Sequence, residues 1–470
     1  PVPKQKNRLG VIKKLIERKD VDYFVNACDA AREGELIFRE IVKYVGVTKP
    51  VKRLWLQSMT KKAIQEGFAN LQNGEKYEGL AAAAECRANA DWLIGMNATR
   101  ALTVRLKSKN QRGVSWSAGR VQTPTLSLLV EREIEVLEHI AQAYWTVQGN
   151  FEVNGQIYDG TWYDPNFDRK TATRELKEDR IFEKAKAEKI IEAIIGKPAL
   201  ASEVRKPSQR QPPLLFDLTS LQRTANTRFG WSATRTLRAA QRCYETHKVL
   251  TYPRTSSKVL PDDYRPEVER VLGSFGAVPE FAPHAKHLQD VGLLNQDKIF
   301  NNEGVTDHFA IIPTGEIRVM EGDDQKLFDL VSRQFMAAFY SPSIYEEVER
   351  TTVVAGNLFR SRPPRVLKQA GWEAVFGKVP DNGDKAFAAL VAGKDKAEGI
   401  TVQSHAAVLE EHETKPPARI SEAGLLSLME NAGRQIENEE ISQALRGADG
   451  LGTAATRADI IENLKNREYV

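Results

Sequence analysis

The chain carries the stretch Val249-Leu250-Thr251-Tyr252-Pro253-Arg254-Thr255-Ser256-Ser257, in which a phenol stands beside a proline and a guanidinium follows two positions later. The proline forces Tyr252 into an extended geometry, so the ring is presented outward, and Arg254 lies on the same side of the extended chain. A Tyr and an Arg that share one phosphate can perform transesterification, with Tyr as nucleophile and Arg neutralising the charge on the non-bridging oxygens. The alternative, usual for an isolated Tyr-Pro-Arg, is a strand-ending turn with a half-buried Tyr.

A single hydrophobic core cannot accommodate all 470 residues, so we expect three or four domains. The formal net charge of +4 permits nucleic-acid contact without demonstrating it. The three cysteines form no Cys-x-x-Cys pair, which indicates a reducing compartment and argues against a zinc site. No apolar run is long enough to span a membrane and the start has no signal-peptide core, so we expect a cytoplasmic protein. Neither end has the pattern of a natural terminus, so we expect that both are cut.

Carboxylates cluster where a predicted strand gives way to a helix. Asp22 to Cys28 reads as a buried strand, the acidic run Asp29-Ala30-Ala31-Arg32-Glu33-Gly34-Glu35 follows, and a helix is expected from Leu36 to Val45. In an α/β sheet, ligands bind beyond the carboxyl ends of strands, and oxygen ligands there suit Mg²⁺. The alternative is a solvated acidic helix start, which the helix dipole favours.

Two further segments offer polar groups suited to a phosphate backbone. A long alanine-rich helix is expected from Tyr77 to Arg105, and a second helix is expected to begin at Leu126. The polar residues that recur on one side of the first are Arg87, Asp91, Asn97 and Arg100. Before the second helix, Ser117 can cap the helix and Gly119 permits close approach of a backbone. Arg120 and Gln122 supply hydrogen-bond donors there. The alternatives are a solvated helix side and an ordinary capped helix entry.

Strand patterns and capped helices follow. Alternation from Tyr144 to Tyr163 with a turn at Asn154-Gly155 predicts a hairpin, Ala199 to Arg205 predicts another strand, and Glu175 to Ile195 predicts a charged helical insertion. A helix opens at Asp217 and ends near Gly230, and Ser232 caps a second one, so these helices and the strands expected after them suggest a winged-helix arrangement. The second helix carries Arg235, Arg238 and Arg242, which form a solvated face or hold a phosphate backbone.

Together these segments resemble the type IA DNA topoisomerases over nearly the whole chain. The Tyr252 stretch resembles the family's active-site tyrosine motif in the Tyr-Pro-Arg form of the topoisomerase III branch. The acidic run resembles the Asp-x-Asp-x-Glu signature of the Toprim domain, and Ser117 to Gln122 resembles the DNA-contact motif Ser-x-Gly-Arg-Val-Gln. Asp307 to Thr314 matches Asp-His-x-Ala-Ile-x-Pro-Thr.

The resemblance carries roles over residue by residue. It implies catalytic roles for Tyr252, Arg254 and His308. It implies metal or acid/base roles for Asp29, Glu33 and, more weakly, Glu35. The DNA-binding residues that we expect are Arg87, Asn97, Arg100, Ser117, Gly119, Arg120, Gln122 and Arg457. One departure concerns the metal, because the family's second Asp is Ala31 here and a methyl group cannot ligate a cation. The family's N-terminal Toprim strand also has no counterpart before Gly10.

The implied fold class is a multidomain α/β plus α+β protein with the toroid of the type IA topoisomerases. The expected parts are a partial Toprim domain at 1–60, a helical DNA-groove domain at 61–143 and 413–470, a β arch at 144–210 and 341–412, and a winged-helix-like tyrosine domain at 211–340.

The implied function is ATP-independent cleavage of single-stranded DNA through a 5′-phosphotyrosine, followed by strand passage and religation with Mg²⁺. The expected partners are single-stranded DNA and a helicase or a single-strand-binding protein, and we expect a monomer, free of membranes and associated with the nucleoid. One alternative is a catalytically impaired single-strand-binding relic or fragment, motivated by Ala31 and the missing N-terminal strand. A Toprim primase is a third reading, which Tyr252 and its surroundings disfavour.

Overall fold

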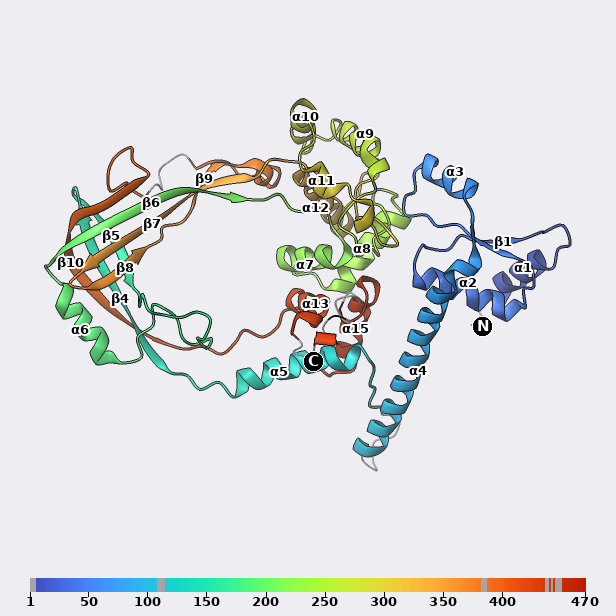
Figure 1. The fold of residues 1–470 in the computed structure, drawn as a ribbon, viewed down its shortest axis with the longest axis horizontal. Helices are drawn as coiled ribbons and strands as arrows, with labels where there is room; N and C mark the ends of the chain where they lie inside the picture. The colour runs from blue at the N-terminus through green and yellow to red at the C-terminus, as the bar shows by residue number, and fades with distance from the viewer. Residues whose placement is uncertain (1–5, 108–114, 382–386, 436–438, 441–442, 444–449) are drawn as a thin grey trace. The chain divides into compact units, whose positions relative to one another are not determined.

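The structure, a computed structural model, describes residues 6–107, 115–381, 387–435, 439–440, 443 and 450–470. The chain divides into two compact units, each built from segments that are separated in the sequence (Figure 1). Unit 1 comprises Pro1–Val130, Pro213–Phe339 and Ile420–Val470, and unit 2 comprises Glu131–Pro212 and Tyr340–Arg419. No helix among the described residues is both long enough and apolar enough to cross a bilayer.

Unit 1 begins with a small three-stranded sheet in the order β1-β2-β3, in which β1 runs parallel to β2 and β3 runs antiparallel to it. Strand β1 is shorter than the predicted strand from Asp22 to Cys28, because its main-chain pairing with β2 ends after three residues. The elements of this part are α1 (Lys6–Ile16), β1 (Phe24–Asn26), α2 (Arg32–Val45), β2 (Val51–Arg53), α3 (Lys61–Ala69), β3 (Gln72–Asn73), a 3₁₀ turn (Gly74–Tyr77) and α4 (Glu78–Leu106).

Helix α5 (Gln122–Leu137) begins four residues earlier than its sequence pattern predicts. The main-chain amides of Thr123 and Thr125 donate to the carbonyls of Gly119 and Val121, so the helical hydrogen bonds begin just before Pro124. Pro124 lies in the first turn of α5, where a proline is tolerated. Ser117 is therefore too far upstream to cap α5, and its hydroxyl instead accepts a hydrogen bond from the Gln122 side chain (3.0 Å).

The rest of unit 1 is a helical assembly in which the predicted caps form. Asp217 and Ser220 make a capping box at α7, Gly230 ends that helix in the left-handed conformation, and Ser232 caps α8. The strands expected after α8 are absent from the described residues as ladders and occur as single bridges such as Leu250↔Pro313. The helices are α7 (Leu218–Phe229), α8 (Ala233–Glu245), α9 (Arg265–Phe275), α10 (Ala282–Val291), α11 (Gln296–Ile299), α12 (Gly322–Ala338), α13 (Glu422–Glu430) and α15 (Ala454–Asn466), with 3₁₀ turns at Asp262–Tyr264, Asn302–Gly304 and Ala432–Gln435.

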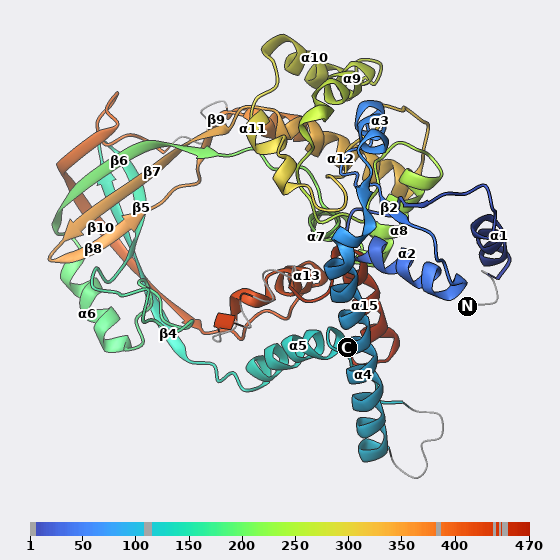
Figure 2. The ribbon, with the colours of Figure 1, turned by 45° about the vertical axis from the view of Figure 1, so that its right-hand side comes forward.

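Unit 2 is dominated by one antiparallel sheet in the order β6-β10-β4-β5-β8-β7-β9. Strand β6 also pairs with β7, so the sheet closes on itself and most strand edges are covered. Its strands lie side by side in both views (Figures 1 and 2). They are β4 (Ala143–Val153), β5 (Gln156–Trp162), β6 (Pro198–Arg210), β7 (Ser343–Val354), β8 (Asn357–Ser361), β9 (Val366–Gln369) and β10 (Lys396–Glu413), with a 3₁₀ turn at Gly371–Phe376.

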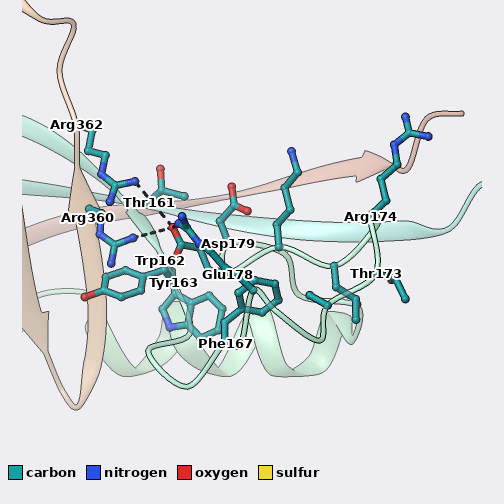
Figure 3. A pocket seen from close by; sticks show the side chains of 14 residues that line it. Thr161, Trp162, Tyr163, Phe167, Thr173, Arg174, Glu178, Asp179, Arg360 and Arg362 are labelled. Atoms are coloured by element: carbon teal, nitrogen blue, oxygen red, sulfur yellow. Dashed lines mark hydrogen bonds and ion pairs between the residues drawn. The ribbon is translucent and has the colours of Figure 1, made fainter. Parts of the chain in front are cut away.

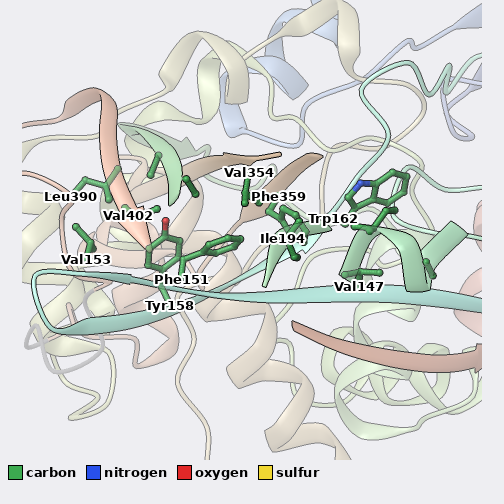
Figure 4. Close-up of a cluster of buried hydrophobic side chains, with 14 of the residues drawn as sticks. Val147, Phe151, Val153, Tyr158, Trp162, Ile194, Val354, Phe359, Leu390 and Val402 are labelled. Carbon is green, nitrogen blue, oxygen red and sulfur yellow. The ribbon is translucent and has the colours of Figure 1, made fainter. Parts of the chain in front are cut away.

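The core of unit 2 is formed by buried side chains of the sheet strands and of α6 (Lys184–Ile194) (Figure 4). Phe151 and Phe359 meet edge to face with ring centroids 5.3 Å apart, and Ile194 is fully buried. Gly149 is required beside these rings, because a Cβ there would lie 2.8 Å from Phe151. The predicted helical insertion is correct only from Lys184 onward, because residues 175–183 run in turns and bends.

Candidate active site and nucleic-acid interface

Tyr252 follows a segment that is held by main-chain hydrogen bonds, and its side chain remains partly accessible to solvent. Val249 and Leu250 are buried, and the amide of Thr251 donates to the Ile312 carbonyl (3.0 Å). The amide of Thr314 donates back to Val249 (2.9 Å), so the segment before the tyrosine is held on both sides. The Tyr252 side chain is half-buried, which fits both the outward presentation expected from the following proline and the alternative of a strand-ending turn.

The Tyr252 ring lies between two other rings. Its centroid is 4.4 Å from that of His308 and 5.4 Å from that of Tyr244, which meets it edge-on at 75°. Burial raises the pKa of the Tyr252 phenol above its ordinary value of 10, the Arg254 guanidinium lowers it, and the Asp29 carboxylate raises it further. The phenol is therefore protonated at neutral pH and close to both charged groups.

His308 links the tyrosine to the start of α2. Its Nε2 lies 3.4 Å from Oδ2 of Asp29, and this contact lowers the pKa of Asp29 below its ordinary value of 3.8. Gly34 makes the close approach of α2 possible, since a Cβ there would lie 2.2 Å from the Asp29 carbonyl oxygen. Three residues that are distant in the sequence, Tyr252, His308 and Asp29, thus form one cluster.

The three acidic candidates have different environments. The side chains of Asp29 and Glu33 are solvent-accessible, whereas Glu35 is 1% exposed. The Glu35 carboxylate lies 3.1 Å from Nε of Arg53 and 3.0 Å from Nε of Arg39, and it accepts a hydrogen bond from Asn26 (2.8 Å). Because these contacts occupy its oxygens, Glu35 helps to hold the buried side of the site. Its contacts argue against the predicted metal role.

Arg53, which pairs with Glu35, also holds the main chain of the acidic loop. Its guanidinium donates to the carbonyl oxygens of Cys28 (2.7 Å), Asp29 (2.6 Å) and Leu54 (2.8 Å). Among the residues that the structure describes, no three His, Cys, Asp or Glu side chains gather as a metal cluster. Two accessible carboxylates nonetheless fit Mg²⁺, which commonly takes one or two carboxylates and completes its shell with substrate phosphates and water.

The predicted backbone-contact residues gather where the stretch before α5 packs on α4. The amides of Trp116 and Ala118 donate to the hydroxyls of Thr103 (3.0 Å) and Thr99 (3.1 Å), which holds this stretch on the helix. Arg120 then reaches Asp91 of α4, with its Nε 2.7 Å from Oδ1. Arg100 is exposed and Arg87 partly so, and neither has an ion-pair partner among the described residues.

Comparison of the sequence with known proteins assigns the chain to one family. The sequence model described as DNA topoisomerase covers residues 75–470 of the chain. This chain belongs to the DNA topoisomerase family. It is similar to the DNA topoisomerase 3 of Bacillus licheniformis (38% identity over 471 residues, 99% of this chain and 62% of that protein) and of Bacillus subtilis (36% over 477 residues, 99% and 62%). The chain thus spans about three fifths of the length of the curated relatives it matches.

The fold agrees with the family assignment. A crystal structure of full-length topoisomerase I from Thermotoga maritima is similar, with a TM-score of 0.66 and 22% identity over 99% of this chain and 69% of that one. The resemblance to topoisomerase III that the motifs suggested is confirmed by the relatives, and the mixed fold class with a large antiparallel sheet is confirmed by the structure.

In this topoisomerase-family chain, several residues that were predicted to contact DNA make contacts within the protein. Arg457 is 2% exposed and donates to the hydroxyl of Thr219 (2.9 Å) and the carbonyl of Gly452 (3.1 Å), so it joins α15 to α7 and does not face a phosphate. On α8, Arg235 and Arg242 pair with Asp323 and Asp324 of α12. Only Arg238 of that row is exposed without an ion pair among the described residues.

Sequence reasoning also missed residues that shape the topoisomerase-family site. Tyr244 lies against Tyr252 and could have been noticed as an aromatic near the end of the helix that leads to it. Gln57 donates to the carbonyls of Val305 (2.8 Å) and Thr306 (2.9 Å), three and two residues before His308. Such amide-to-backbone contacts leave no sequence pattern, because any segment can supply the carbonyl.

Proposed function

We propose that the protein to which this chain belongs is a topoisomerase of the type IA, topoisomerase III kind, which cleaves and rejoins single-stranded DNA without ATP. The carrying observation is that the reachable Tyr252 ring lies 4.4 Å from His308, whose imidazole in turn contacts Asp29. A phenol, a cation beside it and accessible carboxylates are the groups that phosphoryl transfer to tyrosine requires.

In the proposed reaction the Tyr252 oxygen attacks a backbone phosphorus and the 3′ oxygen of the neighbouring nucleotide leaves. The product is a 5′-phosphotyrosine, which retains the energy of the phosphodiester for religation. Arg254 and His308 stabilise charge on the phosphoryl oxygens, and Asp29 holds the His308 ring in place. Because the raised pKa keeps the phenol protonated, an acceptor is needed, and the accessible carboxylates of Asp29 and Glu33 are our candidates. The proton that the carboxylate takes up is then passed to the departing 3′ oxygen, which leaves as a hydroxyl.

We infer that Mg²⁺ assists religation at the same place. Asp29 and Glu33 would hold the ion, Ala31 between them offers no ligand, and DNA phosphates would complete the shell. Bound there, the ion supplies positive charge that offsets phosphate repulsion. Chain residues do the remaining positioning, since the Arg53 guanidinium fixes the carbonyls of the acidic loop.

Strand passage needs a gate, and we propose that the contacts of residues 57–60 form it. Gln57 donates to the segment before His308, and the hydroxyls of Ser58 (2.7 Å) and Thr60 (2.6 Å) donate to one carboxylate oxygen of Asp263. These bonds join the part that carries the acidic loop to the part that carries Tyr252. Their release would separate the two cut ends.

The proposed substrate is single-stranded DNA, held by the residues of α4 and the start of α5. This proposal is supported by the exposed Arg100, the partly exposed Arg87 and the loop that carries Arg120. We expect the protein to act as a monomer in the cytoplasm, together with a helicase or a single-strand-binding protein.

Mapping a covalent DNA adduct tests the proposal. An oligonucleotide labelled at its 3′ end should transfer its label to the chain, whereas the same strand labelled at its 5′ end should not, because the 5′ phosphate is the one retained. Peptide mapping should place the label on Tyr252, and Tyr252→Phe should abolish it. A label on another residue, or transfer from the 5′-labelled strand, would refute the proposed reaction.

The impaired single-strand-binding relic remains a second candidate, because Ala31 leaves two accessible carboxylates where the resemblance implies three. Salt-sensitive binding is expected from either candidate and does not separate them. Relaxation of a negatively supercoiled plasmid by the longer protein does, since only an enzyme can change the linking number.

A further inference from the structure

Unit 2 contains a hollow of about 600 Å³ outside the proposed active site (Figure 3). It lies between the end of β5, the turns that follow it and strand β8, and all its lining residues belong to unit 2. Pockets of ~300–1,000 Å³ are typical of ligand sites in proteins. We call it the β-unit hollow.

The charge of the β-unit hollow is strongly positive. Its cationic lining residues are Arg169, Arg174, Lys177, Arg360 and Arg362, against two acids, Glu178 and Asp179. Glu178 gathers three of the guanidiniums, with distances of 2.9 Å to Arg169, 2.7 Å to Arg360 and 4.0 Å to Arg362. A second carboxylate, Glu349 outside the lining, lies 2.8 Å from Arg362 and 3.9 Å from Arg360, so two carboxylates face three guanidiniums and a net positive charge remains at this point.

Two cations at the rim are unpaired. Arg174 and Lys177 are exposed, and in the described part of the chain neither side chain makes an ion pair or hydrogen bond. Figure 3 shows Arg174 projecting away from the cluster around Glu178. Charges of this kind contribute little to folding and are available to a phosphate.

Aromatic faces accompany these cations. The Arg360 guanidinium lies 3.7 Å from the centroid of the Tyr163 ring, and Phe167 lines the same hollow. Trp162 is 7% exposed and forms part of the floor. Single-stranded nucleic acids are bound by this pairing of features, with bases stacked on aromatic or Arg planes and phosphates along a positively charged groove.

We propose that the β-unit hollow is a second binding site for single-stranded DNA, with phosphates at Arg174 and Lys177 and a base against Tyr163 and Phe167. A simple anion would not need the aromatic rings, and an acidic peptide would not need stacking planes. The choice of DNA as the occupant rests on the proposed function. The site itself rests on the lining residues and would hold a strand without cleaving it.

Photochemical cross-linking tests the site directly. The Tyr252→Phe chain is irradiated with an oligonucleotide that carries 5-iodouracil, and cross-linked peptides are mapped by mass spectrometry. We expect adducts on Tyr163 or Phe167, in addition to any on unit 1. Absence of adducts between residues 161 and 179 would overturn the proposal.

A charge-reversal pair supplies the quantitative arm. Arg174→Glu with Lys177→Glu should remove the adducts of residues 161–179 and make the slope of log affinity against log salt at that site shallower by about 1.4, for two lost phosphate contacts. The control is Lys189→Glu with Lys394→Glu, two exposed lysines of unit 2 outside the hollow, with the same charge change. Equal adducts in both double variants, at matched thermal stability, would refute the assignment.

The outcome is separable from that of the proposed function. Covalent adduct formation at Tyr252 is measured in the Arg174→Glu, Lys177→Glu chain with a short strand, and it should match the parent chain. Cleavage without adducts at the hollow would sink only the second site. Adducts at the hollow without cleavage would sink only the proposed reaction.

Discussion

Ala31 is the residue at which helix capping and metal binding meet. It occupies the N-cap position of α2 with extended backbone angles (φ −152°, ψ 176°), and no side chain caps the helix there. An Asp, Asn or Ser in this position can accept a hydrogen bond from the first-turn amides. The same position would be the third carboxylate of the acidic run, so a substitution there changes two properties that must be separated.

We therefore predict different outcomes for Ala31→Asp and Ala31→Asn. Both should stabilise the chain by about 1 kcal/mol through the new cap. Only Ala31→Asp should lower the Mg²⁺ concentration that supports plasmid relaxation by the longer protein, because an amide is a poor substitute for a carboxylate. Denaturant unfolding and a Mg²⁺ titration of relaxation measure the two effects. An equal gain in relaxation by Ala31→Asn would rule out the metal explanation.

Asp29 allows a second prediction, which concerns His308. Asp29→Asn should reduce adduct formation by about 10²-fold, since the imidazole loses the carboxylate that holds it. The free energy of unfolding at neutral pH should change by less than about 1 kcal/mol, because the Asp29 side chain is 61% exposed. Since the pKa of Asp29 is lowered on folding, its contribution is present above the ordinary value of 3.8 and is lost as the pH falls through the lowered pKa. Parent and variant should therefore converge in stability only in acid.

Among the elements, the two tight hairpins of unit 2 differ in how well their residues suit the turn. The β4–β5 turn uses Asn154 (φ 51°) and Gly155 (φ 76°), which both accept the left-handed region. The β7–β8 turn uses Ala355 (φ 46°) and Gly356 (φ 77°). An Ala in that region carries the steric cost of its Cβ, roughly 1 kcal/mol, with no side-chain hydrogen bond to compensate.

We predict that Ala355→Asn stabilises unit 2 by about 0.5–1 kcal/mol and that Asn154→Ala destabilises it by a similar amount. Ala355→Gly should also stabilise, by less, because glycine adds chain entropy to the unfolded state. Thermal unfolding of the three variants checks the order. Destabilisation by Ala355→Asn would show that the turn differs from the one described.

At the scale of the molecule, the proposed gate contacts concern unit 1 alone. Asp263 accepts both hydroxyls of the 58–60 segment, whereas its neighbour Asp262 contacts Arg265 (3.3 Å) and Asn302 (2.8 Å) on its own side. Asp263 thus bridges the two parts that the proposed gate must separate, whereas the adjacent Asp262 does not. Hydrogen bonds to charged groups contribute about 1.5–3 kcal/mol each, so their loss should shift a gate equilibrium measurably.

We predict that Asp263→Ala raises the equilibrium fraction of covalent complex by about tenfold, because loss of the closing hydrogen bonds lowers the free energy of the separated, cleaved state relative to the closed one. Asp262→Ala is the matched control and should leave that fraction unchanged. Gel quantification of adducts with a 3′-labelled strand provides the measurement. A rise of the same size in both variants would indicate a general loss of stability in this region.

Local features explain how much of this architecture could be predicted. The Asn154-Gly155 turn, the Ser232 cap and the end of α7 at Gly230 were correct because each depends on residues a few positions apart. The roles of Tyr252, Arg254 and His308 in phosphoryl transfer stay predictions from their residue types and motifs, within the family that the sequence model shows.

Long-range packing settled the rest. The resemblance implied a weak metal role for Glu35 and a DNA contact for Arg457, yet Arg53 and Thr219 take up their polar groups. The closing of the sheet through β6 and β7 likewise joins segments more than a hundred residues apart. A sequence pattern records what a side chain can do, whereas burial and the partners available in three dimensions determine which of those interactions it makes.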